Sequence, residues 1–350
     1  MTALAPAPTP DATAPAEVPR GSLLRAEVRR FRSRRFIQVL LALTLAGFVL
    51  AVGLAAATEY GNPTPAALAE AQARVDAAVV EQEGYRQQCL ADPGRPAGVD
   101  ATDYCGPATT AENIPIGQFL DEEPFVLADA LPPGGIAAAV VTAALAFLIG
   151  ATWVGAEWSS RSMVALLFWV PRRTAVMRAK LTVLVAATAL LGVVAQALWW
   201  GTALLLAATL GRATPLPDDF YADLLGQQAR SVLLVVLVGL LGFGFSNLMR
   251  GTGAALGVGF LYFAIVENAV RNLRPSWQEW LLTDNAAALV LPGGNTLYLY
   301  DESFVDPTTG FTGGGRELVL SNLHGGLVLG FATAALVAVG VVVFARRDLH

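Results

Sequence analysis

The sequence predicts an all-α polytopic membrane protein, with six transmembrane helices and an external helical loop domain between the first two. Composition is the first reason: the 350 residues are 55% hydrophobic and 15% charged, whereas a soluble domain has about 25% charged residues. The second reason is that the apolar residues gather in six runs, each near the length of about 20 residues that crosses a hydrocarbon core. The third is that basic residues are concentrated in alternate connecting segments.

The six apolar runs set the positions of the predicted spans. They cover about residues 36–57, 135–156, 181–205, 231–249, 252–270 and 325–345. Each run is expected to be helical, because lipid offers no hydrogen-bond partner to an open backbone. The fourth run passes to the fifth through Met249-Arg250-Gly251, which predicts a tight turn. The runs and their connections form one predicted domain over residues 36–348.

The distribution of Lys and Arg predicts the orientation. Residues 1–35 hold seven Arg and residues 157–180 hold five cationic residues. The alternate segments hold only eight in more than twice the length; they are 58–134, 206–230 and 271–324. Because cytoplasmic loops carry the excess of Lys and Arg, both ends of the chain and the segment 157–180 are expected in the cytoplasm. Residues 58–134 are then an external insert.

The N-terminal residues divide into two parts. Residues 1–19 are rich in Pro, Ala and Thr, which predicts a disordered tail. Over residues 20–35, Leu24, Val28 and Phe31 recur at helical spacing among arginines. This pattern predicts a basic amphipathic helix that lies on the inner membrane surface before the first span.

The external insert is expected to contain a helix over Thr64–Leu90, followed by turns. It also holds the two cysteines of the chain, Cys89 and Cys105. An exported compartment permits disulfides, and a bond closing a loop of about 15 residues adds on the order of 3 kcal/mol. A metal or redox pair is the alternative, but the spacing is not CxxC and both histidines are distant. We therefore expect a structural disulfide.

Between the fifth and sixth runs lie apolar stretches that are too short to cross the membrane twice. Trp277 and Trp280 belong to the first, and Pro275 and Pro292 bound the region. We expect re-entrant or interfacial helices here, at the outer face.

The sequence lacks the motifs of soluble catalysis. Lys180 is the only lysine, and it is not preceded by a glycine, so the chain contains no GxxxxGK[ST] phosphate-binding loop. Hydrolase and zinc-protease motifs are also missing from the sequence. We expect no enzyme activity, no metal and no cofactor in this chain, and no nucleic-acid partner.

Two positions carry polar residues at membrane depth. Glu267 and Asn268 lie near the outer end of the fifth run, and an ionisable residue there is a functional-site hypothesis. The alternative is that Glu267 pairs with Arg271 one helical turn away. Gln196, in the third run, is explained by a hydrogen bond between helices.

The segment between the second and third runs reads EWSSRSMVALLFWVPRRTAVMRAK over residues 157–180. It is basic and partly apolar, which indicates a surface where another component docks. The alternative is that its apolar residues pack on the chain's own bundle.

Together with the six runs and the basic amphipathic leader, this segment resembles the permeases of the ABC type-2 exporter family. In that family the second span ends in Glu, followed by a small residue with Ser or Thr, then Leu-Leu, then Pro-x-Arg and a closing Lys. The matching residues here are Glu157, Arg161-Ser162, Leu166-Leu167, Pro171-Arg172-Arg173 and Lys180. The chain departs from the pattern at Arg161, where Gly is usual. The likeness covers about residues 21–348.

The resemblance implies a coupling helix that docks on a separate ABC ATPase subunit, which carries ATP and Mg²⁺. It further implies a connecting helix at residues 20–35, a second permease copy, and a multi-pass location in a bacterial plasma membrane, within the lipid bilayer. The expected coupling residues are Glu157, Arg161, Leu166, Leu167, Pro171, Arg172 and Arg173.

Another functional class fits the same features. A signalling or assembly protein would use the external insert to bind an envelope partner and would transport nothing. A secondary transporter is disfavoured, because it calls for ionisable residues at mid-membrane and for internal repeats.

Overall fold

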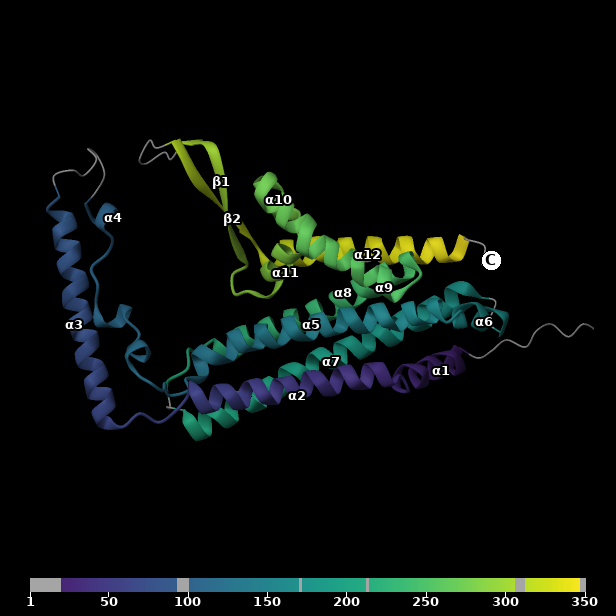
Figure 1. The fold of residues 1–350 in the computed structure, drawn as a ribbon, viewed down its shortest axis with the longest axis horizontal. Coiled ribbons are helices and arrows are strands. Elements are labelled where there is room, and N and C mark those ends of the chain that lie inside the picture. The colour runs from purple at the N-terminus through teal and green to yellow at the C-terminus, as the bar shows by residue number, and fades with distance from the viewer. Residues whose placement is uncertain (1–19, 93–100, 170–171, 212–213, 306–311, 347–350) are drawn as a thin grey trace, which may run out of the picture.

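The computed structural model describes residues 20–92, 101–169, 172–211, 214–305 and 312–346, so the predicted tail 1–19 lies outside the described residues. Long helices run side by side in one elongated bundle, and α3 stands across its end (Figure 1). Among the described residues, six helical segments are long and apolar enough to cross a membrane. They are α2 (Arg35–Thr58), α5 (Leu127–Ser159), α7 (Arg173–Leu210), α8 (Phe220–Met249), Thr252–Leu273 and α12 (Asn322–Arg346). The six predicted spans are therefore confirmed in length and composition.

The fifth of these segments is continuous but not uniformly α-helical. It consists of α9 (Thr252–Phe260), the π-helical turn η3 (Leu261–Val266) and α10 (Glu267–Leu273). The tight turn before it is confirmed, because α8 ends at Met249 and α9 begins at Thr252. Arg250 makes this turn with a left-handed backbone (φ 53°).

The two ends of the bundle carry different elements. α1 (Arg20–Arg32), α6 (Ser162–Trp169) and the last turns of α12 lie at one end, which we call the α6 end (Figure 1). α3 (Pro65–Leu90) and a β-hairpin lie toward the opposite, α3 end. This separation agrees with the alternation that the charge pattern predicts. Which end faces the cytoplasm stays a prediction.

Several helices are longer than the apolar runs that predicted them. α7 has 38 residues, or about 57 Å at 1.5 Å per residue, well beyond a hydrocarbon core of about 30 Å. It begins at Arg173 rather than near residue 181, because the residues before the apolar run also favour a helix. Lys180 consequently lies two turns inside α7.

α5 and α8 form the centre of the bundle, and small residues allow their close approach. A Cβ on Gly150 of α5 would lie 2.0 Å from the carbonyl oxygen of Gly239 on α8. Glycine at this crossing lets the two backbones touch. Near the α3 end, α7 and α8 also bind carbonyls of α5: Gln196 Nε2 donates to Gly135 (2.9 Å), and Gln227 Nε2 to Pro132 (2.8 Å). The helix–helix hydrogen bond expected of Gln196 is confirmed.

The insert contains the predicted helix. α3 starts at Pro65, and the Thr64 hydroxyl accepts from the backbone N–H of Ala67 at 3.2 Å. Cys89, at the end of α3, is joined to Cys105 of α4 (Ala101–Cys105), with the two Cα atoms 5.8 Å apart. The predicted disulfide is present. The 3₁₀ turns η1 (Ala111–Asn113) and η2 (Ile116–Phe119) follow.

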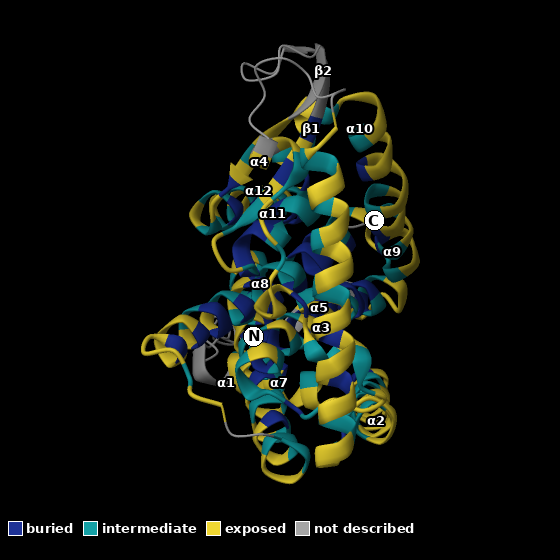
Figure 2. Cartoon of the chain, turned by 90° about the vertical axis from the view of Figure 1, so that its left-hand side faces the viewer, coloured by how far each residue is buried: buried dark blue, intermediate teal, exposed yellow. Residues whose placement is uncertain are grey.

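Most of α3 remains accessible. Only Ala71 and Val75 are buried in it, and the view toward the α3 end shows long exposed stretches (Figure 2). The carboxyl of Glu83 accepts hydrogen bonds from Arg86 and Gln87, which lower its pKa to about 2; the bond from Arg86 has the larger effect. The helix is thus stabilised mainly by local contacts and the disulfide rather than by a core of its own.

The region between the fifth and sixth spans differs in part from the prediction. The 3₁₀ turn η4 (Pro275–Trp280) and α11 (Leu282–Val290) occupy the first half, where short helices were expected. An antiparallel β-hairpin follows, formed by β1 (Asn295–Val305) and β2 (Thr312–Leu320). Leu297 and Leu299 alternate along β1 and pack with Ala288 of α11. The all-α prediction is corrected here, because this period-two pattern favours a strand.

Candidate functional site

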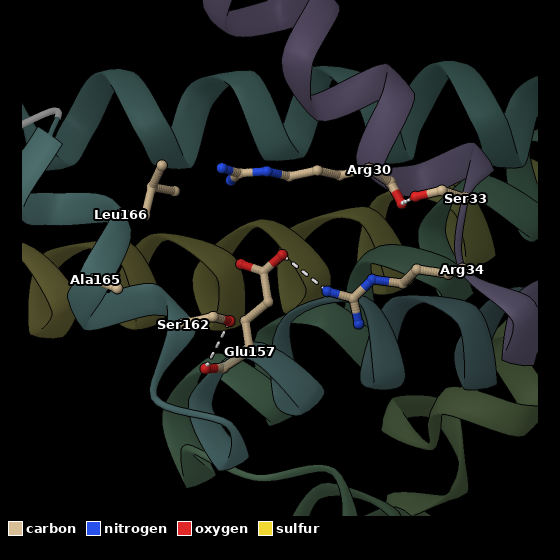
Figure 3. Close-up of a pocket in the computed structure, with 7 residues that line it drawn as sticks. All are labelled: Arg30, Ser33, Arg34, Glu157, Ser162, Ala165 and Leu166. Carbon is tan, nitrogen blue, oxygen red and sulfur yellow. Dashed lines mark hydrogen bonds and ion pairs between the residues drawn. The ribbon is translucent and has the colours of Figure 1, made fainter.

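A cluster of buried charges connects four segments at the α6 end. Figure 3 shows the part of it in which Arg34 pairs with Glu157. Glu27 lies on α1, Arg34 between α1 and α2, Glu157 on α5 and Lys180 on α7. Glu27 and Lys180 are fully buried, and Glu157 is 5% exposed. Charges this deep are costly unless each has a partner, so their contacts define the site.

Lys180 is at the centre of the cluster. Its Nζ lies 2.8 Å from Glu27 Oε2 and 2.8 Å from Glu157 Oε2. Arg34 Nη2 donates to the other oxygen of Glu157 at 2.8 Å, and Arg30 Nη1 to the other oxygen of Glu27 at 3.1 Å. Three cations therefore meet two carboxylates, and every carboxylate oxygen has a cationic partner.

A buried indole lies beneath the cations. Trp153 of α5 is fully buried; Lys180 Nζ lies 4.5 Å and Arg34 Cζ 4.9 Å from its ring. Phe31 of α1 packs edge-on against the same ring at 5.1 Å. Cation–π contacts are strongest where water is excluded. The indole thus adds to the attachment of α1 to α5 and α7.

A pocket of about 510 Å³ lies between this cluster and α6. Arg30, Arg34 and Glu157 line one side, and Ser162, Ala165 and Leu166 of α6 line the other (Figure 3). The side chain of Arg30 is 46% exposed. One cation in excess and an exposed guanidinium make the pocket suited to an anionic group. The described residues contain no group of three His, Cys, Asp or Glu side chains that could hold a metal.

α6 follows a strained turn. Arg161 adopts a left-handed backbone (φ 55°) between α5 and α6, a conformation that costs a non-glycine residue about 1–2 kcal/mol. The permease family that the sequence resembles usually has Gly at this position. Arg161 makes the same turn at some cost in stability. The Ser162 hydroxyl then donates to the Glu157 carbonyl at 3.4 Å.

The two faces of α6 have different surroundings. Met163 is fully buried, Leu166 is 8% exposed, and Leu167 packs partly against the same core cluster. Phe168, in contrast, is 83% exposed. Leu166 and Leu167 were expected to contact a partner. Leu166 is buried within the chain and Leu167 is partly buried, and contact of either residue with a partner stays a prediction.

The exposed side of α6 continues into the turn before it. Ala165 and Phe168 of α6 are exposed, and so is Arg161, which precedes the helix with a left-handed backbone. We call these three residues the α6 stripe. Sequence reasoning grouped Phe168 with the other apolar residues of the loop but could not separate the two faces, because every residue from 163 to 169 is apolar.

The basic residues after α6 have separate roles. Arg173 Nη1 donates to the carbonyls of Phe344 (3.5 Å) and Ala345 (3.3 Å), at the end of α12. Its charge therefore faces the negative end of that helix. Arg172 is exposed, and Pro171 lies outside the described residues.

Glu27 was missed by the sequence reading. One feature of the sequence could have indicated it: Glu27 is the single acidic residue among the basic residues of α1. An acid inside a helix otherwise suited to an anionic membrane surface needs a cation in the protein. Glu157 and Lys180 are the two ends of the segment 157–180, and Lys180 pairs with both Glu27 and Glu157.

The possible intramembrane site is not one site. Glu267 is fully buried; it accepts from the Thr283 backbone N–H at 3.2 Å and lies 3.6 Å from Arg271 Nη2. Its predicted pairing with Arg271 is present, and Arg271 also binds Asp284 at 2.9 Å. Asn268 is exposed and donates to a carbonyl of its own helix. Gln196, which binds α5, belongs to neither group.

Comparison with known proteins assigns no family: no protein-family model and no curated protein matches this chain.

Proposed function

We propose that this chain is the transmembrane subunit of an ATP-driven exporter in a bacterial plasma membrane. In this proposal two permease copies work together, and a separate ATPase subunit docks on the α6 stripe. The observation that carries the proposal is that α6 buries one of its faces and exposes the other. One face lies in the bundle core, and the other presents Phe168, at 83% exposure, on the predicted cytoplasmic side.

A membrane pump without a phosphate-binding loop must receive work through a surface. Force on the stripe would pass to the bundle through Met163 and Leu166, which are buried against the spans. The cluster around Lys180 would pass it on, because its ion pairs join α1, α5 and α7. Close-packed interiors transmit such displacements because they have low compressibility.

The stripe also indicates the chemistry of the partner. An exposed Phe suits an apolar pocket, and aromatic anchors are common among the residues that dominate binding. Arg161 beside it suits an acidic rim. ATP and Mg²⁺ would be held by the partner.

The test is ATPase binding by stripe variants. The full chain is co-expressed with candidate ATPase subunits from the same genome, and affinity is measured for Phe168→Ala and Arg161→Glu. Loss of an anchor worth about 2 kcal/mol weakens binding about thirtyfold, and charge reversal adds repulsion against an acidic surface. Arg316→Glu, an exposed change on β2 at the α3 end, is the matched control and should bind normally. If both stripe variants bind like wild type, the docking proposal fails.

The exposure of α3 supports a second candidate. A helix with Val80 and Tyr85 at 74% and 63% exposure fits an envelope-binding surface in a protein that signals without transport. Substrate-stimulated ATP turnover in the reconstituted complex separates the two functions, because only the exporter requires it.

A further inference from the structure

A second pocket, of about 460 Å³, lies at the opposite end of the bundle from α6. One wall is the first three turns of α8, and the facing wall is formed by Pro132, Gly293 and Asn322. Leu224 and Gln227 are buried at its base, whereas Asp219 and Asp223 are exposed. The pocket therefore has an apolar and amide base and an acidic mouth.

Among the described residues that line this pocket, Arg230 is the only cation. Its Nε is buried and has no hydrogen-bond partner among the described residues. Its Nη1 lies over Gly226, 3.5 Å from where a Cβ on that glycine would stand. The guanidinium thus points along α8 toward the mouth, yet no described carboxylate forms an ion pair with it. A buried guanidinium atom without a partner indicates an anion that arrives from outside the chain.

The depth of Arg230 matches a lipid headgroup. Arg250, in the tight turn at the α6 end, lies twenty residues along from Arg230. At 1.5 Å per residue this is about 30 Å, the thickness of a hydrocarbon core. If Arg250 marks one edge of the bilayer, Arg230 marks the other, where phospholipid phosphates lie.

The order of charges along α8 specifies the headgroup further. The guanidinium lies level with Gly226, and Asp223 is three residues nearer the helix start, or about 4.5 Å outward. In the pocket the cation lies deeper and the carboxylate lies farther out. A headgroup with a deeper phosphate and an outer amine therefore places each of its charges opposite a residue of the other sign. The ethanolamine link of phosphatidylethanolamine is short enough to place its two charged groups against these two partners.

We propose that this pocket binds the headgroup of a phospholipid with a primary amine. Arg230 holds the phosphate through charge-assisted hydrogen bonds, and Asp223 accepts from the ammonium. Phosphatidylglycerol lacks the amine, and the quaternary ammonium of phosphatidylcholine has no N–H to donate. The proposal requires no ATPase, so it stands or falls independently of the proposed transport function.

Native mass spectrometry of the full chain in detergent tests the site, with equal amounts of phosphatidylethanolamine, phosphatidylcholine and phosphatidylglycerol of the same acyl chains. Wild type should retain phosphatidylethanolamine preferentially. Arg230→Gln should weaken this retention on the order of tenfold, the effect of losing one charge-assisted hydrogen bond. Arg274→Gln, an exposed arginine outside the pocket, is the control and should change nothing.

Asp223→Asn gives an independent test, because Asp223 is exposed and its replacement leaves the fold intact. It should abolish the preference for phosphatidylethanolamine over phosphatidylglycerol. An unchanged preference in this variant, or unchanged retention in a folded Arg230→Gln protein, overturns the proposal. Free phosphoethanolamine is the remaining arm: if it displaces the lipid readily, the ligand is a soluble phosphate ester and the lipid assignment is wrong.

Discussion

Lys180 of α7 and Glu157 of α5 form a buried ion pair, with Nζ 2.8 Å from Oε2. These residues are the two ends of the loop that resembles an exporter coupling segment. Both point into the bundle rather than toward a partner, so they hold the loop in place while the α6 stripe between them stays exposed. Breaking a buried pair by removing one partner costs much more than the pair contributes.

Lys180→Met is therefore expected to destabilise the protein by about 3–5 kcal/mol, because it leaves Glu27 and Glu157 short of a cation in a buried site. The measurement is thermal unfolding of the purified chain in detergent. Adding Glu27→Gln should recover part of the loss, since Glu157 keeps Arg34. If the double variant is as unstable as the sum of the single variants, the two residues are not coupled and the cluster has no energetic role.

Arg161→Gly should raise the free energy of unfolding by about 0.5–1 kcal/mol, because release of the left-handed strain exceeds the entropy that glycine loses. Arg250→Gly is the matched comparison, with nearly the same φ. Arg250 also lies 5.2 Å over the Trp158 ring, so its replacement loses a cation–π contact and should gain less. Unfolding temperatures of the two variants, measured side by side, provide the check; a larger gain at position 250 would contradict this account.

The two faces of α6 predict opposite effects on stability. Leu166→Ala should cost about 2–5 kcal/mol, since it empties a buried site. Phe168→Ala removes an exposed ring and should stay within about 0.5 kcal/mol of wild type. Thermal unfolding of both variants in the same detergent tests the orientation of the helix, and a destabilised Phe168→Ala protein would show that α6 is turned the other way.

The Cys89–Cys105 disulfide should stabilise the insert rather than the bundle. Reduction is expected to cost the insert on the order of 3 kcal/mol, seen as faster amide hydrogen exchange in α3 with unchanged exchange in α5 and α8. The Cys89→Ser/Cys105→Ser variant should show the fast exchange without reductant and no further change with it. Uniform acceleration across the bundle would contradict a local role.

The positive-inside pattern predicts opposite sides for α3 and α6. In the same cysteine-free background, Tyr85→Cys should react with an impermeant thiol reagent in intact cells, and Phe168→Cys only after permeabilisation. Both positions are well exposed, at 63% and 83%, so access to the reagent depends on the side of the membrane. Labelling of both positions from outside would reject the six-span orientation.

Local features account for what could be predicted before the structure. Span number follows from run length, and α3 from helix-favouring residues after Pro65, because each depends on residues close together in the chain. The Cys89–Cys105 bond followed from there being two cysteines in one segment. The β-hairpin was not predicted. Leu297 and Leu299 alternate as in a strand, but the helical patterns on both sides of this segment favoured an all-α prediction.

By itself, the sequence determined the class of the protein: six apolar helices, a basic leader, a disulfide-linked insert and a basic loop between the second and third spans. Only the tertiary structure decided that Glu27 meets Lys180, 153 residues away, and that Leu166 faces inward while Phe168 faces outward. It also showed that Nε of Arg230 is buried without a hydrogen-bond partner among the described residues. The physical reason is that span formation depends on the hydropathy of neighbouring residues. The partner of a buried charge, and the face that an almost wholly apolar helix buries, depend on how distant helices pack.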